Sequence, residues 1–405
     1  MYLPRTLEPR LQRLAHFFPA VVVSGARQSG KTTLLKHCFP NYSYVSLDLP
    51  STAEQAERNP EEFLSRHPAP LIIDEVQYAL GIFRHLKTAI DKDRHATGRF
   101  ILTGSQHFSL MKGVSESLAG RIGLLELETL ARNELPLPDG RQATQQRSTI
   151  LTKQIVRGQF PELWRVPDFP EGDYYAAYLA TYLERDVRQI LNVTSLRDFE
   201  RFIRILASRS GNLLNKSDLA RDVGVSVKAI GDWLSVLQAS GQIAILEPWF
   251  TNIAKRVVKT PKVYFRDTGL LCYLLNLSIE TLGGSPLLGA VWESYVYAEL
   301  RKLISFQENP IGLWFYRDQR GREIDFVLDI GGALNFVEVK WLEHPRLDDA
   351  RTIKAVAQEL RDKNGTHRPG RHYVVGNPED LYSLNSETEA LNVDELKRVL
   401  APGSR

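Results

Sequence analysis

The sequence contains little cysteine and no long apolar run. Among its 405 residues only Cys38 and Cys272 are cysteines, and they lie far apart in apolar, helix-like contexts. Two such residues exclude a disulfide framework and a zinc site. No apolar stretch approaches the roughly 20 residues that a membrane-spanning helix requires, and the first residues lack the apolar segment and cleavage site of a secretory signal. We therefore expect a cytoplasmic protein that does not enter a membrane.

A large excess of one charge is also missing. The chain has 51 Lys and Arg against 48 Asp and Glu, a formal net charge of +3. This balance is weak evidence for any partner, because a near-neutral total can hide a local basic stripe. The length exceeds what one ordinary hydrophobic core supports, so the sequence predicts two or three domains.

The first third of the chain alternates short apolar runs with helical stretches. This alternation is typical of an α/β fold with a parallel sheet that helices cover. The predicted strands are residues 20–23, 44–47, 71–73, 99–102 and 123–127. We expect domain boundaries that give this α/β core at 1–138, a helical region at 150–212, a helix-turn-helix region at 213–262 and a second α/β domain at 263–405.

Residues 25–32 read GARQSGKT, the pattern of a phosphate-binding loop. The loop follows an apolar strand and opens a helix, so backbone N–H groups and the helix N-terminus offer positive potential to phosphates. Lys31 is expected to reach the β and γ phosphates of ATP, and the Thr32 hydroxyl is expected to bind Mg²⁺. The predicted nucleotide contacts are Gly25, Ala26, Gln28, Ser29, Gly30, Lys31, Thr32 and Thr33.

Polar residues end two further strands of the predicted sheet. Asp74 and Glu75 follow the apolar run at 71–73. This arrangement predicts that Asp74 holds the metal and that Glu75 activates the attacking water. The strand at 99–102 is followed by Thr103, Gly104 and Ser105. Ser105 either senses the γ-phosphate or orients the attacking water, or it simply caps the strand end.

Residues 216–238 (KSDLARDVGVSVKAIGDWLSVLQ) match a helix-turn-helix. Ser217 and Ser226 are the predicted caps of the two helices, and Gly224 supplies the turn. The second helix offers Lys228 near its start. A basic cluster follows, which is either a hairpin that contacts DNA phosphates or a solvated edge or packing surface. Its members are Lys255, Arg256, Lys259 and Lys262.

A third group of charged residues is Glu293, Asp325, Glu338 and Lys340. Asp325 and Glu338 lie within apolar strands, where a charge is costly unless it is used. Carboxylate oxygens suit Mg²⁺ or Mn²⁺, and a lysine beside them can orient or deprotonate a water. The group therefore predicts a metal-dependent phosphodiesterase site in which Lys340 is catalytic and not a ligand. The alternative is a hairpin with solvent-facing charges.

These motifs together resemble the AAA_14/DUF4143 family of AAA+ superfamily ATPases. The resemblance is carried by GARQSGKT, LIIDEVQ, FILTGSQ, LAGRI, GQFPE, the helix-turn-helix, KTPKVYFRDTGLLCYLL, GAVWESYV, REIDFVL and FVEVK. It implies a P-loop ATPase domain, a winged helix and a C-terminal PD-(D/E)xK domain of the restriction-endonuclease-like fold. It also implies a homo-oligomer in which Arg121 of LAGRI acts on the neighbouring subunit's nucleotide.

One segment departs from the family pattern. Arg157, Gly158 and Gln159 stand where two adjacent glycines usually precede the aromatic residue and the proline, which leaves the contacts to adenine open.

Two functional hypotheses follow from the sequence. The first is an ATP-hydrolysing protein that acts on DNA, through remodelling, translocation or branched-DNA processing, with a C-terminal domain that binds or cleaves DNA. The second is a nucleotide-dependent regulatory switch whose catalytically inactive tail binds other proteins.

Overall fold

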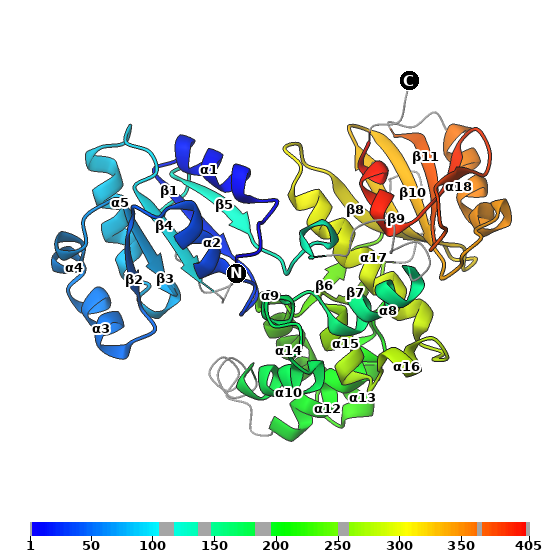
Figure 1. The fold of residues 1–405 in the computed structure, drawn as a ribbon, viewed down its shortest axis with the longest axis horizontal. Coiled ribbons are helices and arrows are strands. Elements are labelled where there is room, and N and C mark those ends of the chain that lie inside the picture. Colours follow the sequence, from blue (N-terminus) through cyan, green and yellow to red (C-terminus); the bar gives the residue numbers. More distant parts are fainter. Residues whose placement is uncertain are drawn as a thin grey trace. The chain divides into compact units, whose positions relative to one another are not determined.

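The computed structural model describes residues 2–104, 117–136, 147–182, 196–249, 259–362 and 367–401. The chain folds into two compact units (Figure 1). The first unit comprises Met1–Leu130, Phe160–Val166 and Ala239–Gln242, and the second comprises Ala131–Gln159, Pro167–Gln238 and Ile243–Arg405. The four-part division expected from the sequence stays a prediction.

The first unit is built on a parallel five-stranded sheet in the order β2-β3-β4-β1-β5. Its strands confirm all five predicted from the sequence. They are β1 Ala20–Ser24, β2 Ser43–Ser46, β3 Leu71–Asp74, β4 Phe100–Gly104 and β5 Ile122–Glu126. Because neighbouring strands run in the same direction, their carboxyl ends meet at one edge of the sheet.

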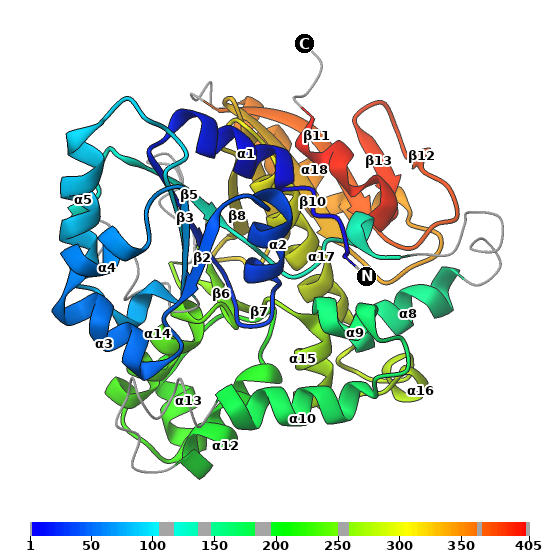
Figure 2. The same ribbon diagram turned by 60° about the vertical axis from the view of Figure 1, so that its left-hand side comes forward.

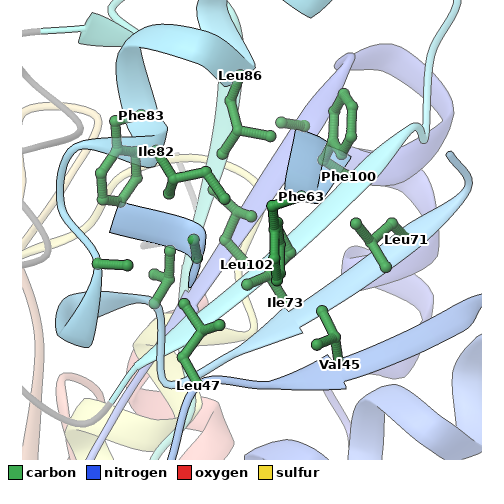
Figure 3. Packing of buried hydrophobic residues seen from close by; sticks show 14 of the residues in the cluster. Val45, Leu47, Phe63, Leu71, Ile73, Ile82, Phe83, Leu86, Phe100 and Leu102 are labelled. Carbon is green, nitrogen blue, oxygen red and sulfur yellow. The ribbon is translucent and has the colours of Figure 1, made fainter. Parts of the chain in front are cut away.

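Helices cover this sheet and form its hydrophobic core. Figure 3 shows one layer, in which Phe63, Phe83 and Leu86 pack on strand residues such as Ile73 and Leu102. Each fully buried side chain of this size contributes about 1.5–3 kcal/mol. The helical elements of the first unit are α1 Glu8–Phe17, α2 Lys31–Cys38, α3 Pro50–Arg58, α4 Pro60–Arg66, η1 Val76–Tyr78, α5 Ile82–Lys92 and α9 Pro161–Arg165.

The second unit begins with a mainly helical part. Its elements are η2 Arg132–Glu134, α8 Arg147–Arg157, α10 Glu171–Tyr182, α12 Leu196–Ala207, α13 Lys216–Val223, α14 Val227–Ala239, α15 Thr268–Leu274, α16 Ile279–Leu282 and α17 Leu288–Ser305. A two-stranded antiparallel sheet joins β6 Ile243–Leu246 to β7 Lys262–Phe265. None of the helices among the described residues has the length and apolar character needed to cross a membrane.

The helix-turn-helix forms at α13 and α14. Gly224 ends α13 with a positive φ of 85°, which glycine adopts without strain. Ser226 caps α14 as predicted, since its Oγ accepts the Ala229 N–H at 3.1 Å. The predicted cap of α13 is wrong: the side chain of Asn215, and not that of Ser217, accepts the first N–H groups of that helix.

The C-terminal part of the second unit is a six-stranded sheet in the order β12-β13-β11-β10-β9-β8. The long helix α17 and the helix α18 lie beside it (Figures 1 and 2). The remaining elements are β8 Gly312–Arg317, β9 Glu323–Ile330, β10 Ala333–Val339, η4 Leu347–Ala350, α18 Arg351–Arg361, β11 Arg368–Val375, β12 Tyr382–Ser383, β13 Thr388–Leu391 and η5 Val393–Leu400.

An irregularity in β9 re-aims two of its side chains. Trp314 pairs with Val327 and Tyr316 pairs with Ile324, so two steps along β8 oppose three along β9. Ile324 and Val327 therefore both join the core that contains α18, whereas the ring of Phe326 contacts Tyr297 of α17. A bulge of this kind commonly re-aims a side chain next to a functional site, and here it lies at Asp325.

Candidate functional site

The phosphate-binding loop leaves the carboxyl end of β1 and leads into α2. Gly25 has a φ of 148°, and a Cβ there would lie 2.2 Å from the carbonyl oxygen of Leu127. Gln28 and Gly30 also have positive φ values, 60° and 93°. Glycine is therefore required at position 25 both for its backbone conformation and for the space beside Leu127.

The polar groups of the loop are gathered inside it. Lys31 is buried, and its Nζ donates to the carbonyl oxygens of Gly25 at 3.0 Å and Ala26 at 2.9 Å. Ser29 is completely buried, and its Oγ has no hydrogen-bond partner among the described residues. A buried polar atom without a partner is costly, so this loop is arranged for a polar ligand such as phosphate.

The strand β3 brings Asp74 to the start of α2. Thr32 Oγ1 donates to Asp74 Oδ2 at 2.7 Å, and the hydroxyl of Tyr44 donates to the same oxygen at 2.8 Å. Burial and the Asp74 carboxylate raise the pKa of Tyr44. A hydroxyl and a carboxylate are oxygen ligands that Mg²⁺ accepts, so the arrangement of Thr32 and Asp74 fits the predicted metal. Tyr44 was not expected here, since an aromatic residue in a strand is ordinarily a packing residue.

Glu75 follows Asp74 in a left-handed conformation with a φ of 55°. A non-glycine residue in this region costs on the order of 1 kcal/mol and commonly marks a functional position. The Glu75 N–H donates to Asp74 Oδ1 at 3.0 Å, and Gln77 Nε2 donates to the Glu75 carboxylate. At the end of β4, Thr103 is fully buried, and its Oγ1 has no partner among the described residues. Ser105 lies outside the described residues.

Arg121 is held within its own chain. Its Nε and Nη2 donate to the two carboxylate oxygens of Asp91 at 2.7 and 3.1 Å, and its Nη1 donates to the Ala119 carbonyl. The hydrogen bond from Arg121 lowers the pKa of Asp91. A role on a neighbouring subunit's nucleotide would require Arg121 to leave Asp91, and that role stays a prediction.

Arg5 ties the phosphate loop to the segment after β5. It is buried, and it donates to the carbonyl oxygens of Ser29 at 2.9 Å and Glu128 at 2.7 Å. Sequence reasoning missed this residue, because nothing around it marks a long-range partner. Beside it lies a cavity of about 120 Å³ lined by Tyr2, Leu3, Arg5, Gly30, Thr33, Leu130, Pro161, Glu162 and Arg165.

The segment that departs from the family pattern is a buried part of the second unit. A Cβ on Gly158 would lie 2.0 Å from the Tyr175 hydroxyl, and Gly158 has a φ of 72°. Gln159 is fully buried; its N–H donates to Asp267 at 2.8 Å and its Nε2 donates to Glu299 at 2.6 Å. The glutamine that stands in this segment, Gln159, is thus held by hydrogen bonds to Asp267 and Glu299.

The second unit brings the predicted charged group together with an additional lysine. Glu293 lies on α17, Asp325 on β9, Glu338 on β10, and Lys340 directly after β10. Lys262, the first residue of β7, is 1% exposed, and its Nζ lies 2.9 Å from Glu293 Oε1. Sequence reasoning assigned Lys262 to a basic surface, so its place in this cluster is a correction.

Asp325 and Glu338 are both buried acids. Asp325 Oδ2 accepts the Val339 N–H at 2.8 Å, and Lys340 Nζ lies 2.8 Å from Glu338 Oε1. Burial and the charge of Glu293 raise the pKa of Asp325 well above its ordinary value. Burial also raises the pKa of Glu338, against the opposing charge of Lys340.

The predicted set of three carboxylate ligands is not assembled. Glu338 Oε2 is buried without a partner among the described residues, but Glu293 is bonded to Lys262. Within the described ranges, no three His, Cys, Asp or Glu side chains are grouped so that they would hold a metal ion. Only two of the three predicted carboxylate ligands for Mg²⁺ or Mn²⁺, those of Asp325 and Glu338, are therefore not bonded to Lys262.

The residues predicted to contact DNA divide into three groups. Lys228 and Lys259 are exposed, as that prediction requires. Lys255 and Arg256 lie outside the described residues. For Lys262 the prediction is wrong, because its ammonium is buried and paired with carboxylates.

Three family models match consecutive parts of the chain. Residues 18–135 match the AAA domain, residues 148–281 match a domain of unknown function (DUF8612), and residues 288–396 match another (DUF4143). The N-terminal part, with its phosphate loop and acidic strand end, is therefore similar to AAA domains. The expected combination of this domain with DUF4143 is confirmed, while the winged helix and the nuclease-like fold stay predictions.

The chain is 29% identical to two uncharacterised mycobacterial proteins, Mb2031c of Mycobacterium bovis and Rv2008c of Mycobacterium tuberculosis, over 98% of its own length and 87% of theirs. Among solved structures, the Walker-type ATPase of Pyrococcus abyssi is 16% identical, with a TM-score of 0.44 over 68% of this chain and 96% of that one. The RuvB Holliday junction branch migration motor of Thermotoga maritima is 16% identical, with a TM-score of 0.29 over 59% and 88%.

Replacing Gly25 with alanine should weaken ATP binding about tenfold or more, equivalent to about 1.4 kcal/mol, because the methyl group would collide with the Leu127 carbonyl. Titration with a fluorescent ATP analogue measures this. Gly321→Ala is the matched control, since Gly321 has a φ of 79° and open space around it. Equal affinity in Gly25→Ala and the wild type would contradict the assigned loop geometry.

Tyr44→Phe should raise the Mg²⁺ concentration needed for half-maximal ATP turnover about tenfold or more. The substitution keeps the ring beneath Lys36 but removes a hydrogen bond to a charged carboxylate, worth about 1.5–3 kcal/mol. Steady-state phosphate release over a Mg²⁺ series gives the value, and Tyr42→Phe serves as the control. An unchanged Mg²⁺ requirement would show that the tyrosine hydroxyl does not orient Asp74.

Proposed function

We propose that the first unit binds ATP with Mg²⁺ and hydrolyses it at the carboxyl edge of its sheet. The observation that carries this proposal is the meeting of three groups there: the loop around Lys31, the Thr32–Asp74 hydrogen bond, and Glu75. On ATP binding, the Lys31 ammonium exchanges its two carbonyl acceptors for β- and γ-phosphate oxygens. Thr32 and Asp74 would hold the Mg²⁺, which would supply positive charge to neutralise the phosphates.

In this proposal Glu75 is the general base. Its carboxylate takes a proton from water as the water oxygen bonds to the γ-phosphorus and the bond to the ADP oxygen breaks. Gln77 donates to that carboxylate and fixes its orientation. Thr103 contributes a buried hydroxyl from the neighbouring strand β4. We propose that this hydroxyl contacts the γ-phosphate or the attacking water, the role that the sequence predicts for Ser105.

The cavity beside the loop is the proposed site for the adenine ring. It is lined by Gly30 and Thr33 at the start of α2, and by Tyr2 and Arg5 near the N-terminus. Pro161 follows the segment that departs from the family pattern and also lines the cavity. A ring placed there would lie beside Gly30 and Thr33, next to the loop proposed to hold the phosphates.

Glu75→Gln should keep ATP affinity within about threefold and lose turnover by about 100-fold or more, the usual contribution of a general base. Nucleotide titration and phosphate release measure the two effects separately. Glu54→Gln, an exposed glutamate on α3, is the matched control. Turnover in Glu75→Gln equal to the wild-type rate would refute the assigned base.

For the target of this ATPase we propose DNA, bound through the helix-turn-helix, and we propose assembly into a homo-oligomer that uses Arg121 between subunits. The supporting observation is local: Lys228 is exposed in the first turn of α14, after the Ser226 cap. The alternative is the nucleotide-dependent switch with an inactive tail. The ion pairs of the C-terminal carboxylates favour that alternative over DNA cleavage.

ATP turnover measured with no DNA and with single-stranded, duplex and junction DNA distinguishes these targets. We expect at least one DNA to stimulate turnover, with a stimulation that falls as salt rises. Lys228→Ala should reduce the stimulation, while Lys354→Ala, an exposed lysine on α18, should not. Absence of stimulation and of salt-sensitive binding with every DNA would favour the switch.

A further inference from the structure

Four carboxylates of the second unit share one buried region. They are Glu293 of α17, Glu323 and Asp325 of β9, and Glu338 of β10. Asp325 and Glu338 are each 8% exposed. A buried carboxylate is unfavourable unless opposite charges or hydrogen-bond donors compensate it, so the compensating groups decide what this cluster can bind.

Lys262 is the most deeply buried of these compensating groups. Its Nζ lies 2.9 Å from Glu293 Oε1 and 2.6 Å from Glu323 Oε1, so one ammonium joins a helix to a strand. Two residues along β7, on the same face of the strand, the Tyr264 hydroxyl donates to Glu293 Oε1 at 2.5 Å. The Nζ also lies 5.5 Å from the centre of the Phe315 ring. Glu293 is therefore directed toward Lys262 and Tyr264.

The remaining two acids keep some capacity for another cation. Asp325 Oδ2 accepts the Val339 N–H, and Glu338 Oε1 pairs with Lys340. Glu338 Oε2 is buried without a partner among the described residues. Two carboxylates are a weak ligand set for Mg²⁺ or Mn²⁺, whereas a third carboxylate group would strengthen it considerably.

We infer that Lys262 is a built-in cation that competes with a divalent metal ion for this carboxylate cluster. It binds Glu293 and so withholds the third ligand. It also makes the net charge of the cluster less negative: four carboxylates, the ammonium groups of Lys262 and Lys340 and the Arg317 guanidinium paired with Glu323 sum to −1 when all are ionised, and the sum without Lys262 is −2. This inference is independent of the proposed ATPase, which lies in the other unit.

The test is a Mn²⁺ titration of the full chain without nucleotide. The electron paramagnetic resonance signal of free Mn²⁺ measures how much of the metal stays unbound. Lys262→Met should bind Mn²⁺ about tenfold more tightly than the wild type or better, and Mn²⁺ should raise its Tm more than it raises that of the wild type. The control is Lys354→Met, at an exposed lysine on α18. Unchanged or weaker Mn²⁺ binding in Lys262→Met would overturn the inference.

A double variant shows whether Glu293 is the released ligand. Lys262→Met with Glu293→Gln removes both charges of the pair, so it should melt at a higher temperature than Lys262→Met and lose the tightened Mn²⁺ affinity. Tight binding retained in the double variant would contradict the role given to Glu293. If Lys262→Met does not fold, Lys262→Gln removes the charge and leaves only a neutral, weaker donor toward Glu293. Tighter Mn²⁺ binding than in the wild type is expected there too, by a smaller factor than in Lys262→Met, and its absence would overturn the inference.

Discussion

The parallel register of β1, β3 and β4 is the constraint on which the proposed nucleotide site depends. Ser24 pairs with Gly104 and Ile73 with Leu102, so the segments that follow these strands emerge at one edge. A slip of one residue would turn Ile73 and Leu102 out of the hydrophobic core and would exchange the two faces of the strand. Apolar packing on the faces of the sheet therefore sets the separation of the polar groups at its end.

Local signals were enough to predict much of this unit. The five strands, the loop and the acidic pair can each be predicted from a window of about ten residues. The signals are apolar runs, glycines and charges at strand ends. Arg5 and Tyr44 could not be found in this way. Their partners, Ser29 and Asp74, lie 24 and 30 residues away, and only the folded sheet brings them together.

In the second unit, tertiary contacts overturned part of what the local sequence pattern predicted. The sequence pattern identified Glu293, Asp325, Glu338 and Lys340, and the fold does bring them to one region. The same sequence pattern assigned Lys262 to a basic surface, because neighbouring residues are also basic. Packing of β7 against α17 instead buries this lysine, which forms ion pairs with Glu293 of α17 and Glu323 of β9. The cluster of basic residues in the sequence therefore predicted an exposed Lys262, whereas tertiary contacts bury it. The bulge at Asp325 could not be predicted either, because the sequence reading assumed regular alternation along the strand.

In the proposed ATPase site, strand register brings Thr32 into contact with Asp74. Phosphate release by Thr32→Val and Thr32→Ser measures the role of this contact, because valine keeps the shape of threonine without the hydroxyl and serine keeps the hydroxyl. Thr32→Val should lose Mg²⁺-dependent ATP turnover, and Thr32→Ser should retain most of it. Wild-type turnover in Thr32→Val would show that the Thr32 hydroxyl does not hold the metal.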